Sequence, residues 1–127
     1  QCHTLETDLY SKEILFRDID RAFGKYKNLT GLFITNSRAY KIGQYLYERG
    51  RKDLQFAGYD LVQENLDFLE RGIITFLIGQ KPEDQGYKSV QAMFNFLMTG
   101  KKTERTNYSP IDIILKENID YYKNYKF

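Results

Sequence analysis

The stretch from residue 73 to residue 87 constrains the fold of this chain more than any other. Its first part, 73–78, is a short apolar run rich in β-branched and aromatic residues, which is typical of a buried strand. Pro82 then suits the first position of a helix, and the two acidic residues after it place negative charge where the helix dipole favours it. Gln80 lies between strand and helix. A polar side chain at that point suits a ligand site at the carboxyl edge of a parallel sheet.

The rest of the chain alternates helical and extended patterns in the same way. The patterns predict helices near 11–26, 38–49, 62–69 and 82–99, and strands at 31–35, 54–57, 73–78 and 111–115. Strands that alternate with helices at this spacing form βαβ units. We therefore predict an α/β fold, a three-layer αβα arrangement with a mostly parallel sheet and helices on both of its faces.

The predicted helices carry apolar stripes and local end signals. Ser11 is expected to cap the first helix, in which Leu15 and Ile19 belong to the core stripe, and Asn36 with Ser37 can cap the second. Glycines at 50, 72 and 100 are expected to end the second, third and fourth helices. The core stripe of the second helix is Ala39, Ile42, Gly43 and Leu46, and the apolar face of the longest is Tyr87, Val90, Met93, Phe94 and Leu97.

The composition argues against several classes of protein. A formal charge of +2, from 19 Lys and Arg against 17 Asp and Glu, gives no reason to expect a nucleic-acid or membrane surface. The single cysteine, Cys2, cannot form an internal disulfide, which fits a reducing compartment. No apolar run reaches membrane-spanning length and no signal peptide is evident, although a chain that begins at Gln1 can be an excised part.

The sequence contains few of the residues and motifs that enzymes use for catalysis. The sole histidine, His3, lies in an irregular start, so neither a catalytic triad nor a metal cluster is expected. There is no Gly-rich phosphate loop and no nucleophile elbow. We expect a protein that is not an enzyme and needs no cofactor. The tail, 121–127, interleaves tyrosines with lysines and could stack on single-stranded nucleic acid, but a fraying terminus or a docked helix end is the simpler interpretation.

Three polar residues follow three of the predicted strands. They are Asn36, Asp60 and Gln80. Because the carboxyl ends of parallel strands lie along one edge of the sheet, we expect these side chains to converge on one crevice. Two amides and a carboxylate can bind several hydroxyl groups of a polar ligand. The alternative is that Asn36 and Asp60 only cap helices and that Gln80 only stabilises its own turn.

The amino-acid sequences of three segments resemble those of one known family. The segments 31–37 (GLFITNS), 56–60 (FAGYD) and 76–86 (FLIGQKPEDQG), in this order and spacing, resemble the periplasmic-binding-protein-like effector domain of the lactose-repressor (LacI) family. The resemblance runs from about Ser11 to Tyr122, and 109–118 (SPIDIILKEN) looks like the closing strand of the Bacteroidetes branch. It implies a two-lobed domain that closes on a sugar or other small metabolite, with Asn36, Asp60 and Gln80, together with Tyr59 of the Gly-Tyr-Asp motif, at the ligand.

The resemblance also implies that only the carboxy-terminal half of such a domain is present. By the family's topology, 1–79 and 111–122 belong to the carboxy-terminal lobe, and the helix and loop 82–107 belong to the other lobe, followed by a tail at 123–127. The apolar face of the long helix would then lack its normal cover. We expect it to pack on a partner chain or, in a shifted position, on its own sheet. No helix-turn-helix precedes Ser11, so DNA would be bound only through an absent amino-terminal part.

A second surface predicts self-association. Tyr40, Gln44 and Tyr47 lie on one face of the second helix, opposite its core stripe, with Tyr45 near the edge. Tyrosines at helical spacing suit a protein interface because they combine a large apolar area with a polar tip. The family's dimer contact uses this helix as well. The alternative is that the tyrosines lie singly on a solvated helix.

These observations together predict the effector-binding and dimerisation part of a cytoplasmic, homodimeric LacI-family transcriptional regulator. The effector would be sugar-like, and its binding would control DNA binding through hinge closure. Two alternatives of other classes remain. One is a periplasmic sugar-binding protein or the sensor domain of a two-component system. The other is a receiver-like module that accepts phosphate at Asp60 with Mg²⁺, although the acidic pair and positioned lysine of that fold are not evident.

Overall fold

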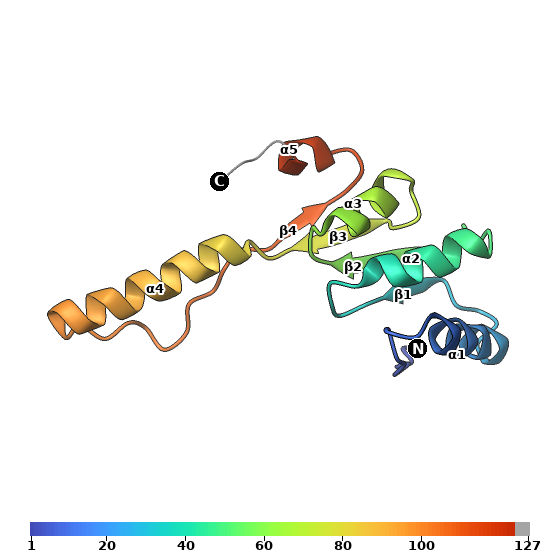
Figure 1. Ribbon diagram of the computed structural model, residues 1–127, viewed down its shortest axis with the longest axis horizontal. Helices are drawn as coiled ribbons and strands as arrows, with labels where there is room; N and C mark the ends of the chain where they lie inside the picture. Colours follow the sequence, from blue (N-terminus) through green and yellow to red (C-terminus); the bar gives the residue numbers. More distant parts are fainter. Residues whose placement is uncertain (124–127) are drawn as a thin grey trace.

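The computed structural model describes residues 1–123, so the last part of the predicted tail, 124–127, lies outside the described residues. The chain forms helices and strands in strict alternation from α1 to β4 (Figure 1). The elements are α1 (Lys12–Lys25), β1 (Gly31–Phe33), α2 (Ala39–Glu48), β2 (Gln55–Tyr59), α3 (Gln63–Glu70), β3 (Phe76–Gly79), α4 (Pro82–Thr99), β4 (Asp112–Ile114) and α5 (Ile119–Lys123).

The sheet has the order β1-β2-β3-β4, and its first three strands are parallel. β4 returns antiparallel to β3. The predicted α/β fold with a mostly parallel sheet is confirmed. The pairing of Leu32 with Phe56 and of Tyr59 with Ile78 fixes which side chains share a face, because side chains alternate along each strand.

One face of the sheet packs on α2 and α3 and holds the core. Phe56, Leu77 and Ile114 are fully buried there. Gly58 lies so close to α2 that a Cβ added to it would stand 2.5 Å from the Cβ of Ala39, so the close approach of helix and sheet requires glycine at this position. On the opposite face, Phe33 and Ile113 are 55% and 46% exposed. The described residues therefore supply one complete helical layer on this sheet.

The third strand begins later than the apolar run predicts. The backbone N–H groups of Ile73 and Ile74 both donate to the carbonyl of Phe68, at 3.0 and 3.2 Å, so these residues are tied to the end of α3. Thr75 then bridges to the sheet: its N–H donates to the carbonyl of Phe56, and its Oγ1 accepts from the N–H of Phe56. Ile73 and Ile74 are still buried, so the prediction of a core segment holds while its first residues lie outside the strand.

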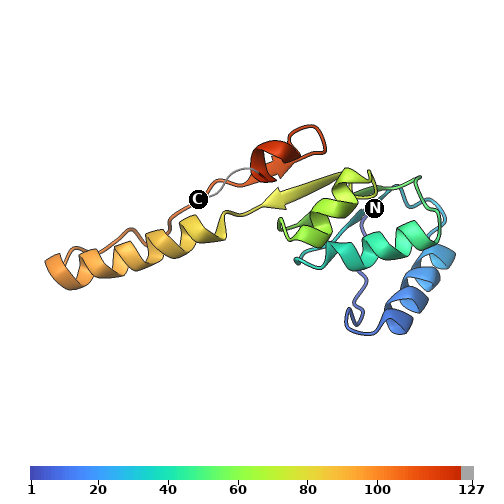
Figure 2. The same cartoon turned by 45° about the horizontal axis from the view of Figure 1, so that its top comes forward.

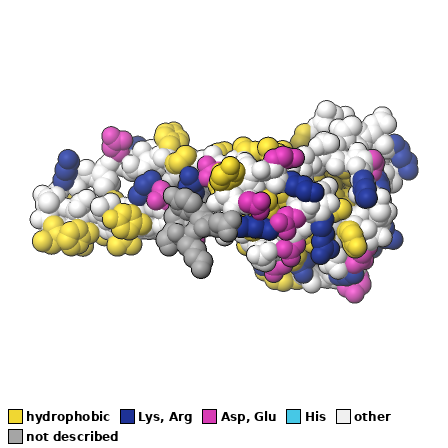
Figure 3. Space-filling model, turned by 90° about the horizontal axis from the view of Figure 1, so that it is seen from above, with side chains coloured by type: hydrophobic (Ala, Val, Ile, Leu, Met, Phe, Trp, Pro, Cys, Tyr) yellow, Lys and Arg dark blue, Asp and Glu magenta, His cyan; other side chains and the backbone are white. Residues whose placement is uncertain are grey.

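α4 extends away from the body of the molecule (Figures 1 and 2). Its bounds agree with the predicted 82–99, and Gly100 ends it in the left-handed conformation. No residue of this helix is buried. Hydrophobic side chains gather along the arm in the view of Figure 3. The expectation that this face packs on the chain's own sheet is therefore wrong, and packing on a partner chain stays a prediction. None of the helices in residues 1–123 combines the length and apolar character needed to cross a membrane.

α1 packs against α2 through a buried tyrosine. Tyr45 is 2% exposed, and its hydroxyl donates to Asp20 of α1 at 2.7 Å. The ring meets Phe16 edge-on, with the centroids 5.0 Å apart. The placement of Tyr45 near the edge of an exposed face is therefore wrong, because α1 covers that side of α2.

Burial, together with the bond to the Asp20 carboxylate, raises the pKa of Tyr45 to about 12. The unfolded chain loses this proton near pH 10, so stability that is present below pH 10 is lost as the pH rises towards 12. We expect the free energy of unfolding of the wild type to fall by about 1 kcal/mol more than that of Tyr45→Phe between pH 9 and pH 11. Chemical denaturation across this range measures it. Tyr47→Phe, on the same helix but 58% exposed, is the control and should follow the wild type. Parallel curves for Tyr45→Phe and wild type would contradict the assignment.

Candidate ligand site at the carboxyl edge of the sheet

The three predicted strand-end residues lie at the same edge of the sheet. Asn36 is in the loop between β1 and α2, Asp60 directly follows β2, and Gln80 directly follows β3. The amide nitrogen of Gln80 donates to Oδ1 of Asp60 at 3.2 Å, so two of the three side chains meet across adjacent strands. Asn36 is exposed, and its Oδ1 accepts from the backbone N–H of Arg38 at 2.9 Å. Asn36 thus shares the edge with the pair and forms a turn within its own loop.

Asp60 has a backbone conformation that ordinary residues avoid. Its φ is +67°, in the left-handed region, and its N–H donates to the carbonyl of Ile78 at 2.9 Å. This conformation costs a residue with a Cβ about 1–2 kcal/mol. Aspartate tolerates it better than most, and glycine adopts it freely. The half-buried carboxylate is thus held at the sheet edge by a strained turn.

The chain passes through this edge twice, and an ion pair joins the two passages. Lys81 leads from β3 into α4 and also has a positive φ, +51°. Its ammonium lies 3.1 Å from Asp112, the first residue of β4 on the way back. The bond to Asp112 raises the pKa of Lys81. Figure 1 shows that the arm formed by α4 and the following loop connects to the body only here.

Tyr59 points to a different part of this edge. By the register of β2 it lies on the face opposite Gly58, and its ring is 5.6 Å from that of Phe33. Tyr59 is half-buried. Its side chain contacts the ring of Phe33, on the exposed face of the sheet. A role of Tyr59 at a ligand stays a prediction.

One polar residue at this edge was missing from the sequence prediction. Asn65 of α3 is fully buried. Its Oδ1 accepts from the N–H of Tyr40 at 2.7 Å, and its Nδ2 lies 2.9 to 3.0 Å from the carbonyl oxygens of Ser37, Tyr59 and Asp60. The signal available in the sequence was its place on the apolar stripe of α3, three residues after Val62 and next to Leu66, where a solvated asparagine would be out of place.

Comparison with known families assigns this fold. Residues 3–102 match the model of a periplasmic binding protein domain. The chain belongs to this family. Comparison with curated proteins gave no significant match.

Solved structures agree with the family assignment. A candidate LacI transcriptional regulator from Bacteroides fragilis is 40% identical, with a TM-score of 0.75, over 84% of this chain and 37% of that one. A solute binding protein from Agrobacterium vitis bound with α-D-tagatopyranose is 21% identical, with a TM-score of 0.80, over 93% of this chain and 40% of that one. A carbohydrate transporter solute binding protein from Agrobacterium radiobacter in complex with D-arabinose is 22% identical, with a TM-score of 0.75, over 89% and 39%. The chain therefore spans about two fifths of the length of these relatives.

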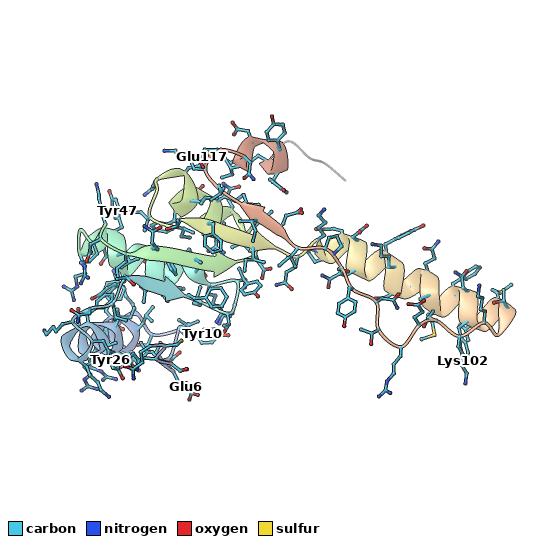
Figure 4. The ribbon with its side chains drawn as sticks, turned by 180° about the vertical axis from the view of Figure 1, so that it is seen from behind. Glu6, Tyr10, Tyr26, Tyr47, Lys102 and Glu117 are labelled. Carbon is cyan, nitrogen blue, oxygen red and sulfur yellow. The ribbon has the colours of Figure 1, made fainter. Side chains whose placement is uncertain are left out.

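The three residues predicted to form a dimer interface differ in their exposure to solvent. Tyr47 is 58% exposed and lies at the end of the body away from the arm (Figure 4). Tyr40 and Gln44 are half-buried, and Gln44 donates to Glu48 on the same helix. The described residues contain no group of three or more His, Cys, Asp or Glu that could hold a metal ion.

The strain at Asp60 can be measured without a ligand. Asp60→Gly and Asp60→Ala both remove the carboxylate and its contact with Gln80, and in the folded state they differ chiefly in how well the new residue accepts a positive φ. We expect the glycine variant to be more stable than the alanine variant by about 1 kcal/mol in urea denaturation. At Lys52, where the backbone is not left-handed, the same pair should show glycine equal or less stable. Equal stability of the two Asp60 variants would contradict the strain.

Proposed function

We propose that the chain is the effector-binding and dimerisation part of a LacI-family transcriptional regulator and that its effector is a sugar. The observation that carries the proposal is the contact of Asp60 with Gln80 across two strand ends, in a chain that is 40% identical to a candidate LacI regulator. The regulator is cytoplasmic and binds DNA through a part other than this chain.

Sugar is the ligand class that fits the chemistry of this edge. A carboxylate accepts hydrogen bonds from hydroxyl groups, and the amides of Gln80 and Asn36 both donate and accept. Pyranose and furanose rings present several hydroxyls at fixed angles, which such a set can bind without a net charge on the ligand. The sugars named with two of the solved relatives, tagatose and arabinose, are of this kind and support the class.

The complete protein has a second lobe, and the arm belongs to it. In this proposal 1–79 and 111–122 form one lobe, and α4 with its loop, 82–107, packs into the other, which covers the apolar face of α4. The exposed side chains of that face support this division, because a row of apolar side chains along one helix face is rarely left open to solvent. The passages at Lys81 and Asp112 are the hinge, and a sugar bound between the lobes favours the closed state by its difference in affinity for the two.

A transport protein or a sensor domain is the second candidate. Several solved relatives are solute binding proteins of sugar transporters, which favours this alternative for the same site. A transporter component would bind sugar as a monomer and would not respond through DNA. The phosphate-accepting alternative for Asp60 gains no support from the family match.

The ligand proposal is tested with the complete two-lobed protein and a panel of mono- and oligosaccharides. At a hundredfold excess over its dissociation constant, a bound sugar stabilises by about 2.7 kcal/mol, which raises the unfolding midpoint by several degrees. Asp60→Ala should weaken binding about 10- to 100-fold, since it removes a charge-assisted hydrogen bond. Isothermal titration calorimetry gives the affinity.

The control is Asp53→Ala, near the opposite end of β2, where an exposed carboxylate pairs with Arg51. This variant should bind like the wild type. If no sugar binds, or if both alanine variants lose affinity equally, the proposed site is wrong.

The dimer proposal is tested by sedimentation of the same protein. Tyr47→Lys places a charge at the most exposed residue of the proposed interface on α2 and should raise the dimer dissociation constant at least tenfold. Tyr121→Lys, the same change at a tyrosine of α5 that is 78% exposed, is the control and should leave the dimer intact. A wild type that stays monomeric at micromolar concentration would contradict the dimer and favour the transport alternative.

A further inference from the structure

Asn65 is the one fully buried polar side chain among the described residues, and its hydrogen bonds leave the helix on which it lies. All of its partners are backbone groups, and they lie at two places: around the start of α2, at Ser37 and Tyr40, and at the end of β2, at Tyr59 and Asp60. The Oδ1 atom accepts one N–H, from Tyr40, and the two N–H groups of Nδ2 are shared by the carbonyls of Ser37, Tyr59 and Asp60. Both the nitrogen and the oxygen of the amide therefore have hydrogen-bond partners, although nothing of the side chain is exposed to solvent.

The first of these places includes the loop that carries Asn36. The carbonyl of Ser37 directly follows that residue, and the N–H of Tyr40 is one of the first-turn donors of α2, which need an acceptor outside the helix. Arg38, at the N-cap of α2, makes no side-chain cap hydrogen bond. Asn65 thus takes the place of the missing local cap from 25 residues away, and this fixes the start of α2 relative to α3.

The second loop carries Asp60. Its left-handed turn directs the carbonyls of Tyr59 and Asp60 towards α3, where Nδ2 of Asn65 donates to both. The loops after β1 and β2 therefore share one side chain, on a helix that is anchored by the buried Leu66 and Leu69. A buried amide that bridges two loops holds their separation more rigidly than an apolar residue could, because each hydrogen bond has a required direction.

We propose that Asn65 is a positioning residue of the ligand site, which sets the distance between the Asn36 loop and the Asp60 loop without touching the ligand. This inference rests on the proposed function, because it assigns the two loops to one sugar site. Beyond that function, it assigns to Asn65 an effect on ligand binding that is transmitted through the Asn36 and Asp60 loops.

The test uses the complete protein and the sugar that stabilises it. Asn65→Asp keeps the shape of the side chain and the acceptor for Tyr40, but it turns an oxygen towards three carbonyls. Asn65→Ser, a milder change, is too short to span the loops. Both variants should weaken sugar affinity 10- to 100-fold at a temperature at which circular dichroism shows them folded. Hydrogen exchange should rise at 36–40 and 59–61 more than elsewhere.

The matched control is Leu15→Ala, a core change in α1, away from the strand ends, which lowers stability through a cavity. This variant should lose stability and keep its affinity within twofold. Wild-type affinity in both Asn65 variants, or a loss of affinity in Leu15→Ala that matches theirs, would overturn the positioning role.

If the wild type binds no sugar, the proposed function fails, and hydrogen exchange then decides on Asn65 alone. A rise confined to the two loops in Asn65→Ser supports the positioning of these loops. A uniform rise, or no rise, overturns it.

Discussion

The parallel pairing of β1, β2 and β3 is the constraint on which the rest of the structure depends. Because these strands run in one direction, the loops that follow them leave the sheet at one edge, and polar residues 44 positions apart in the chain, from Asn36 to Gln80, come to the same place. The hydrogen bond from Gln80 to Asp60 is a direct result of this geometry. The helices between the strands have a second task, since α3 carries Asn65, the side chain that holds two of the loops together.

Local signals in the sequence predict the elements that depend only on nearby residues. Pro82 and Gly100 mark the two ends of α4, and Ser11 caps α1 through the N–H of Ile14, as expected. The prediction fails where a distant group intervenes. The run from Ile73 looks like strand throughout, but Phe68 takes its first two N–H groups. Tyr45 looks like a surface residue until α1 folds over it, and the cap of α2 comes from Asn65 although Asn36 and Ser37 are closer.

In the candidate site too, some features follow from local sequence signals and topology, and others depend on distant groups. The convergence of Asp60 and Gln80 could be predicted, because it requires only the strand ends and the parallel topology. The backbone strain at Asp60 could not, because it depends on how α2, α3 and β2 pack in three dimensions. The place of Asn65 on the apolar stripe of α3 indicates burial, but the groups that it bonds follow only from the same packing. The exposed side chains of α4 and those of the sheet at Phe33 and Ile113 fit the proposal that further protein covers these faces in the complete molecule.

A crystal structure of the complete protein with the sugar that stabilises it tests the central claim most directly. The account predicts sugar hydroxyls within hydrogen-bond distance, about 2.5–3.2 Å, of the Asp60 carboxylate and the Gln80 amide, with Asn65 still bonded to the Ser37 and Tyr59 carbonyls behind them. A ligand bound elsewhere, with Asp60 and Gln80 in contact only with each other, would contradict it, and the strand-end residues would then be structural parts of their own turns.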